Sequence, residues 1–133
     1  MAQLHIVVAD DESGIRHLIC DVLEEEGYAV RAFADGLSAL AAIRTRPPAL
    51  AILDVAMPVM TGDETLRQLR AEGCGVPIIM MTAATNPQRL LSEGASAVLG
   101  KPFDLEALLQ TILRLLAQGR LRASALGEHG RGL

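Results

Sequence analysis

Short apolar runs alternate with segments of helical periodicity along most of the chain. The apolar runs are rich in Ile, Val, Leu and Met, which is typical of strands that are buried on both faces of a sheet. Between them, apolar residues recur every three or four positions, the spacing of an amphipathic helix. The pattern predicts strands at residues 4–10, 28–33, 49–54, 76–82 and 96–100. It predicts helices from residue 15 to Gly27 and at residues 36–46, 63–73, 86–94 and 104–118.

Five strand–helix units of this kind predict an α/β fold, in which a parallel five-stranded sheet carries helices on both faces. Apolar and polar residues alternate more in the segment at 28–33 than in the other predicted strands, so we expect it at an edge of the sheet. Ligands of such open sheets bind beside the carboxyl ends of the strands. The residues at those ends therefore decide which chemistry the fold supports.

Acids, a hydroxyl and a lysine stand at the predicted carboxyl ends of four strands. The first strand ends on Asp10 and Asp11, the third on Asp54 and the fourth on Thr82, and Lys101 follows the fifth. Three carboxylates on one edge repel one another unless a cation joins them. Carboxylate oxygens suit Mg²⁺, which often shares its site with a phosphate. A hydroxyl and an ammonium group suit phosphoryl oxygens, and a carboxylate is a nucleophile in phosphoryl transfer.

Each of these residues has a simpler explanation when it is taken alone. The pair Asp10 and Asp11 would cap the following helix, Asp54 would be a turn residue, and Lys101 would be a solvated surface lysine. Together, at the ends of strands one, three, four and five, they form a set that chance placement does not readily produce. The set predicts a Mg²⁺-dependent phosphoryl-transfer site.

Composition and charge narrow the class of protein. Half of the 133 residues are hydrophobic and 21% are charged, as in a folded globular domain. The formal net charge of -4 argues against a nucleic-acid-binding surface. No apolar stretch approaches the roughly 18 residues of a membrane span. The spacing of Cys20 and Cys74 does not suit a metal site and the N-terminus lacks a signal-peptide pattern, so we expect a cytoplasmic protein with reduced thiols.

The chain resembles the receiver domains of response regulators in two-component signalling. The resemblance runs from about residue 4 to about residue 116, and its carriers are VVADDE, ADGLSAL, PALAILDVAMPVMTG, IIMMTA and EGASAVLGKPF. It implies a flavodoxin-like, doubly wound (βα)5 fold with strand order 2-1-3-4-5. We expect a stand-alone receiver domain at residues 1–118.

The resemblance implies a role for each acid. Asp54 is expected to be the phosphoacceptor, which receives a phosphoryl group from the phosphohistidine of a histidine kinase or a histidine phosphotransfer protein. Asp11 is expected to bind Mg²⁺ directly and Asp10 to act through water. Asp54 and the backbone carbonyl of Ala56 would complete the protein ligands.

The same resemblance covers the other strand ends. Thr82 matches the switch hydroxyl that moves onto the phosphoryl oxygens, and Lys101 matches the partner of the remaining oxygen. Ala83 fits the small residue that leaves the acceptor accessible. The Lys101–Pro102 bond is expected to be cis, which is a proline phenomenon.

Two features depart from the family pattern. Most receivers carry Tyr or Phe three residues before the lysine, whereas this chain has Val98. A β-branched side chain has no ring to rotate, so the usual coupling of threonine to an aromatic residue is expected to be absent or rerouted. The stretch at 82–94 is about one helical turn shorter than is typical, and Asn86-Pro87 delays the fourth helix. We therefore do not assume the usual output surface.

These observations favour a phosphoacceptor signalling domain over an enzyme. An aspartate-nucleophile phosphohydrolase usually places a second acid two residues after the nucleophile, where this chain has Ala56. The alternative is a receiver-like interaction module that works without phosphorylation, which Val98 favours slightly and the intact acid set opposes. Regulation of a partner, shuttling in a phosphorelay and a phosphate sink are all compatible with the sequence, and no downstream partner is indicated.

The last residues, 119–133, are rich in glycine and carry Arg120, Arg122 and Arg131. We expect a short, flexible tail. A basic docking segment is the alternative. The tail is too short for a DNA-binding output domain.

Overall fold

The computed structural model describes residues 3–84 and 86–131, and five strands alternate with five helices in these stretches. The strands are β1 (His5–Ala9), β2 (Ala29–Phe33), β3 (Leu50–Asp54), β4 (Ile78–Thr82) and β5 (Ala97–Gly100). The helices are α1 (Ser13–Glu25), α2 (Gly36–Thr45), α3 (Gly62–Ala71), α4 (Gln88–Ser92) and α5 (Leu105–Arg131). The chain divides into two compact units, Met1–Pro102 and Phe103–Leu133, so that all five strands lie in the first unit.

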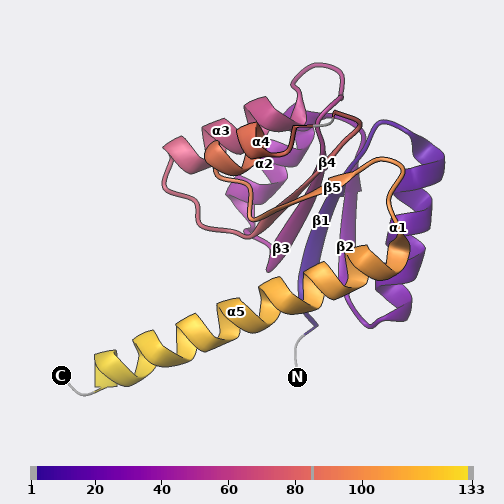
Figure 1. Ribbon diagram of the computed structural model, residues 1–133. Coiled ribbons are helices and arrows are strands. Elements are labelled where there is room, and N and C mark those ends of the chain that lie inside the picture. The colour runs from indigo at the N-terminus through magenta and orange to yellow at the C-terminus, as the bar shows by residue number, and fades with distance from the viewer. Residues whose placement is uncertain (1–2, 85, 132–133) are drawn as a thin grey trace. The chain divides into compact units, whose positions relative to one another are not determined.

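The strands form one parallel sheet in the order β2-β1-β3-β4-β5, as the resemblance implies, and β2 lies at an edge as expected. Figure 1 shows α1 on one face of this sheet and α2, α3 and α4 on the other. The pairing brings the carboxyl ends of the strands level with one another. Ala9 pairs with Leu53, and Thr82 pairs with Gly100. The residues that follow these pairs therefore leave the sheet along one edge.

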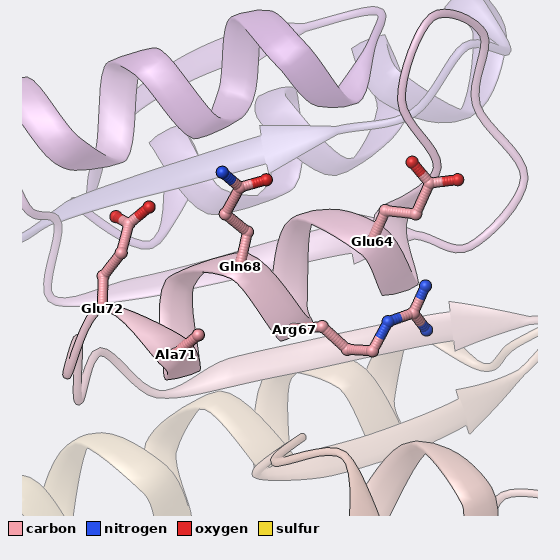
Figure 2. A pocket seen from close by; sticks show the side chains of 5 residues that line it. All are labelled: Glu64, Arg67, Gln68, Ala71 and Glu72. Atoms are coloured by element: carbon pink, nitrogen blue, oxygen red, sulfur yellow. The ribbon is translucent and has the colours of Figure 1, made fainter.

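The helix α3 has a polar face towards solvent and an apolar face towards the sheet. Its outer face carries polar side chains beside a shallow depression (Figure 2), with lining residues Glu64, Arg67, Gln68, Ala71 and Glu72. Its inner face carries Leu66 and Leu69, both of which are buried. Apolar residues three apart fall on one side of a helix, and this spacing turns α3 towards the sheet.

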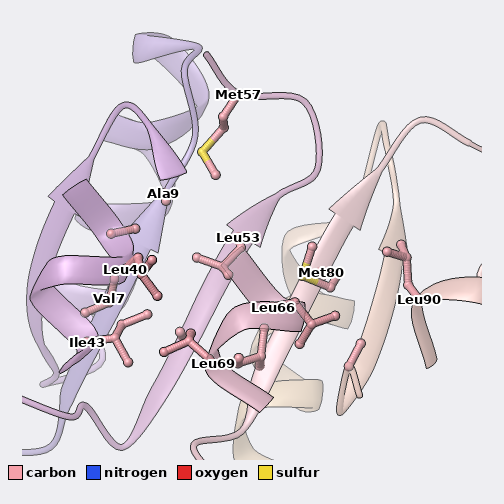
Figure 3. Packing of buried hydrophobic residues seen from close by; sticks show 14 residues of the cluster. Val7, Ala9, Leu40, Ile43, Leu53, Met57, Leu66, Leu69, Met80 and Leu90 are labelled. Atoms are coloured by element: carbon pink, nitrogen blue, oxygen red, sulfur yellow. The ribbon is translucent and has the colours of Figure 1, made fainter. Parts of the chain in front are cut away.

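The core on this side of the sheet is aliphatic (Figure 3). Val7, Leu53 and Met80 of three neighbouring strands meet Leu40 of α2 and Leu66 of α3 in one buried cluster. Because side chains alternate along a strand, the residues between them point to the opposite face. These are also fully buried, as Ile6, Val8, Ile52 and Ile79 illustrate. Burial on both faces explains why the strands read as continuous apolar runs.

The helix ends agree with the sequence in most places. Asp35 caps α2 by accepting a hydrogen bond from Ser38 N at 2.7 Å, and Thr61 caps α3 by accepting one from Glu64 N at 3.3 Å. The fourth helix is short, as predicted, and begins after Pro87. In the described stretches, no helix is both long enough and apolar enough to span a bilayer.

The last helix departs from the prediction. The helical spacing predicts an end at residue 118, but α5 continues to Arg131. The added stretch contains Ala, Leu, Arg and Glu and no proline, so that scattered glycines weaken the helix without ending it. The side chains from residue 120 on, which would form the basic docking segment, and residues 132–133 lie outside the described part. The division into a receiver domain at 1–118 and a flexible tail at 119–133 stays a prediction.

Candidate functional site

Three carboxylates meet at the carboxyl edge of the sheet. Asp10 and Asp11 follow β1, and Asp54 is the last residue of β3. One carboxylate oxygen of each lies within 4.8 Å of the others. Asp10 and Asp54 are buried, whereas Asp11 is exposed. The prediction that these three acids converge is confirmed.

The acids do not serve as a cap for α1. The N-cap residue of this helix is Glu12, and no side chain makes a capping hydrogen bond there. Instead, one carboxylate oxygen of Asp10 (Oδ1) accepts a hydrogen bond from Glu12 N at 2.9 Å, which closes a turn between β1 and α1. The simple explanation of the acid pair as a helix cap is therefore wrong.

Lys101, which follows β5, forms ion pairs with the acids of the site. Its Nζ lies 3.0 Å from Asp10 Oδ2, 3.1 Å from Asp54 Oδ2 and 3.6 Å from Glu12 Oε1. Its backbone N donates a hydrogen bond to Thr82 O at 2.7 Å, which ties the segment after β5 to the end of β4. The bond between Lys101 and Pro102 is cis, as the resemblance implies.

The charges of the site shift the pKa values of both central groups. Burial raises the pKa of Asp54, and the nearby charge of Asp10 adds to the rise, against hydrogen bonds from Lys101 and the backbone of Ala56. Burial works to lower the pKa of Lys101, but its hydrogen bonds to Asp10 and Asp54 outweigh burial and raise it. The carboxylates of Asp10, Asp54 and Glu12 thus share the ammonium group of Lys101, which leaves the site short of positive charge.

The donor set fits Mg²⁺. All three groups offer carboxylate oxygens within reach of one another, and hard oxygen ligands are those that Mg²⁺ takes. Among the described residues, Lys101 is the one cationic side chain that forms ion pairs with these carboxylates, so that a divalent cation would offset the remaining negative charge. Asp11 is the exposed member of the three, so it gives the site a carboxylate that is open to solvent.

A cavity of about 360 Å³ opens beside the acids. The residues that line it come from four strand ends: Asp11, Glu12, Asp54, Val55, Ala56, Thr82, Ala83, Ala84 and Lys101. Thr82 is buried, and its Oγ1 accepts a hydrogen bond from Ala84 N at 3.0 Å. The cavity therefore brings Thr82 and the three small alanines to the same space as Asp54 and Lys101. That Ala56 supplies a carbonyl ligand stays a prediction.

The loop after β3 is held close to Asp54. Gly62 N donates to Val55 O at 2.9 Å and Gly36 N donates to Met60 O at 3.1 Å. A Cβ atom on Gly62 would overlap the backbone of Asp54, so only glycine fits there. Val59 has a φ of 69°, and Met60 N donates to the carbonyl of Pro58 at 2.7 Å across it, which is the hydrogen bond of a strained γ-turn.

Two residues that contact the acids were not predicted. Glu12 approaches Lys101, and Arg16 of α1 donates from Nη1 to the backbone carbonyl of Asp10 at 2.7 Å. The position of Arg16 in the sequence gives only a weak indication of this contact. A residue in the first turn of α1 lies next to the end of the preceding strand, β1. Most arginines in such positions are solvated, so the sequence does not single this one out.

The depression on α3 is larger, with a volume of about 530 Å³, but it lacks comparable chemistry (Figure 2). Among the residues that the structure describes, Glu64 and Glu72 belong to no cluster that could hold a metal ion, and the bidentate partner of Glu72 is Arg44. The carboxyl edge of the sheet is therefore the candidate functional site.

Comparison with known proteins identifies a family whose members share this fold. The model of the response regulator receiver domain matches residues 6–113. The chain is 38% identical over 121 residues to the response regulator MprA of Mycobacterium ulcerans, covering 89% of this chain and 52% of that protein. It is 35% identical over 115 residues to the probable transcriptional regulatory protein TcrX of Mycobacterium tuberculosis, covering 84% and 48%. The chain thus spans about half the length of these curated relatives.

Solved structures give the same result. The receiver domain of the Francisella response regulator 1452 superposes with a TM-score of 0.85 at 28% identity, covering 88% of this chain and 99% of that one. The chemotaxis response regulator CheY4 of Vibrio cholerae superposes with a TM-score of 0.79 at 35% identity, covering 86% and 99%. From the family match, the relatives and the shared fold, the chain belongs to the response regulator receiver domains, which are phosphoacceptor modules of two-component signalling and not enzymes.

Proposed function

We propose that Asp54 accepts a phosphoryl group from the phosphohistidine of a histidine kinase or a histidine phosphotransfer protein, and that the product alters binding of a downstream protein. The observation that carries the proposal is the position of the Asp54 carboxylate. It lies 3.1 Å from Lys101 Nζ, among two further acids, at the wall of an open cavity. A carboxylate so placed is accessible to a phosphorus atom that enters from solvent.

The reaction forms one bond and breaks one. A carboxylate oxygen of Asp54 attacks the phosphorus, the P–N bond to the donor histidine breaks, and the histidine nitrogen leaves with the electron pair and takes up a proton. The product is an acyl phosphate on Asp54. Mg²⁺, held by Asp10, Asp11 and Asp54, would neutralise negative charge on the carboxylates and on the phosphoryl oxygens.

The neighbouring side chains supply positioning and charge. Lys101 provides an ammonium group that is already next to Asp54, so it is placed for a phosphoryl oxygen without a large movement. The hydroxyl of Thr82 lines the same cavity and would donate a hydrogen bond to a second oxygen. Ala56, Ala83 and Ala84 leave room for the phosphoryl group and its donor.

A direct test uses the full chain, a small phosphodonor such as acetyl phosphate, and intact-mass spectrometry. We expect the mass of one phosphoryl group to be gained with Mg²⁺, and no gain when Mg²⁺ is chelated before the phosphodonor is added. Lys101→Ala and Thr82→Ala should slow the gain. The matched control is Thr111→Ala, on α5, which should react like the unmodified chain. A gain that does not require Mg²⁺ would contradict the proposal.

The alternative function, an interaction module that works without phosphorylation, is supported by Val98, which packs partly buried against the core cluster in place of a rotating aromatic ring. Amide hydrogen exchange with and without beryllofluoride, which imitates the acyl phosphate, separates the two functions. Changes that extend from the site into β4 and α4 would support phosphorylation-dependent signalling. Identical exchange outside the site in both states would favour the alternative.

A further inference from the structure

The turn that carries both Asp10 and Asp11 is held at three points. Lys101 Nζ bonds one carboxylate oxygen of Asp10, and Glu12 N bonds the other. The third contact is of a different kind, because Nη1 of Arg16 bonds the backbone carbonyl of Asp10 at 2.7 Å. The first two contacts fix the side chain of Asp10. The third fixes the main chain.

The side chain of Asp11 has no such support. It is exposed, and in the stretches that the structure describes its carboxylate makes no hydrogen bond or ion pair with a protein group. Its direction therefore depends on the backbone. The carbonyl of Asp10 and the nitrogen of Asp11 belong to one planar peptide unit, so a contact that holds the carbonyl oxygen also sets the direction in which the Asp11 side chain leaves.

Arg16 has two opposite effects on a cation at this site. Its positive charge, close to the acids, disfavours a second cation. Its hydrogen bond, which is charge-assisted, keeps the peptide unit in the orientation that places Asp11 near Asp10 and Asp54. Arg16 is half-buried, and within the described residues it forms no ion pair; the hydrogen bond of its guanidinium goes to the backbone carbonyl of Asp10. Its guanidinium is thus committed to the carbonyl rather than to a carboxylate.

We infer that Arg16 is a positioning residue for Mg²⁺: it holds the peptide unit between Asp10 and Asp11 so that the Asp11 carboxylate faces the metal site. The inference rests on the proposed function, in that it takes Asp11 to be a Mg²⁺ ligand. It adds a residue on α1 to a site that is otherwise built from strand ends. It also predicts that positioning outweighs charge.

Isothermal titration with Mg²⁺ on the full chain tests the inference, because the two effects have opposite signs. We expect Arg16→Gln to raise the Kd for Mg²⁺ by about three- to tenfold, since a hydrogen bond to a charged donor is lost. A charge effect alone would lower the Kd instead. Arg16→Lys loses the planar guanidinium but keeps the charge that disfavours a second cation, so its Kd should be at least as high as that of Arg16→Gln.

A double-mutant cycle shows whether Arg16 acts through Asp11. In an Asp11→Asn background, Arg16→Gln should weaken Mg²⁺ binding little further. The matched control is Arg46→Gln, an arginine outside the site, which should leave the Kd unchanged. An unchanged or lower Kd for Arg16→Gln, or the same fold-change in both backgrounds, would overturn the inference.

Two further outcomes separate this inference from the proposed function. If the unmodified chain binds Mg²⁺ and Asp11→Asn weakens binding, but Arg16→Gln leaves the Kd unchanged and only lowers the melting temperature without Mg²⁺, the role of Arg16 is structural and the inference alone fails. If the unmodified chain does not bind Mg²⁺, both fail.

Discussion

At the scale of single residues, the two adjacent acids differ more than their shared chemistry suggests. Asp10 is fully buried, and both of its carboxylate oxygens have protein partners, Lys101 and Glu12 N. Asp11 is exposed and its carboxylate has no protein partner in the described stretches. A carboxylate that is already occupied contributes less to a metal than one that is free.

This difference predicts an order of effects on metal binding. Asp11→Asn should raise the Kd for Mg²⁺ more than Asp10→Asn does, because only the first removes an uncommitted ligand. Isothermal titration of both variants measures the order. The reverse order would mean that the direct ligand and the water-mediated one are exchanged.

A second prediction concerns Asp54 and pH. Burial raises the pKa of this carboxyl group, so that the folded state holds the proton more tightly than the unfolded chain does. The stability that the group contributes is therefore greatest below its unfolded pKa and falls as the pH rises through its folded pKa. Asp54→Asn removes the ionised group and should raise the melting temperature of the metal-free protein at neutral pH.

The advantage of Asp54→Asn should shrink as the pH falls from the raised folded pKa of Asp54 towards the unfolded value of about 4, below which the carboxyl group is protonated in both states. Thermal unfolding at a series of pH values, with a chelator present, measures this. A melting temperature at neutral pH that is equal to or below that of the unmodified chain would show that the Lys101 contact, and not burial, dominates.

At the scale of elements, the loop between β3 and α3 is the most constrained part of the site. Gly62 is needed because a Cβ atom would overlap the backbone of Asp54, the proposed phosphoacceptor. Gly62→Ala should cost about 2 kcal/mol of unfolding free energy or more and should also slow phosphorylation, because Asp54 must shift. Gly75→Ala is the matched control, since nothing lies within 4 Å of a Cβ atom there. Urea unfolding of both variants measures these free energies. An equal loss of unfolding free energy in Gly62→Ala and Gly75→Ala would contradict the steric explanation.

The tip of the same loop stores strain. Val59 has a φ of 69°, which β-branched residues avoid, and its side chain is 79% exposed, so that little packing compensates for the conformation. Val59→Gly should therefore stabilise the protein by about 1 kcal/mol, the difference between the strain relieved and the entropy that glycine adds to the unfolded chain. Urea unfolding checks this, and a loss of stability would mean that the valine side chain makes a contribution that its exposure hides.

The sequence predicts an element well where its apolar residues follow a single clear pattern, either a continuous run or a spacing of three to four residues. The continuous apolar runs of the strands and the spacing of Leu66 and Leu69 follow from burial, so these elements are predictable. The end of α5 is not, because Gly119 weakens a helix without deciding whether it stops. The strained turn at Val59 is not predictable either, because it results from hydrogen bonds that Gly36 and Gly62 make across the fold.

At the scale of the whole molecule, the parallel sheet is what makes the site predictable. Carboxyl ends of parallel strands share an edge of the sheet. This edge brings together Asp10, Asp54, Thr82 and Lys101, although the first and last of them are 91 positions apart in the chain. The contact of Arg16 with the carbonyl of Asp10 is different in kind. It depends on the angle at which α1 leaves the turn, which periodicity does not specify.

The central claim is that the acyl phosphate forms on Asp54 and on no other acid. Its most direct test is chemical trapping: the chain is phosphorylated with acetyl phosphate and Mg²⁺, reduced with borohydride, which converts an acyl phosphate on aspartate to homoserine, and digested for peptide mass spectrometry. We predict homoserine at position 54 alone, with none when Mg²⁺ is chelated or when Asp54→Asn is used. Homoserine at position 10 or 11, or trapping that persists in Asp54→Asn, would contradict the account.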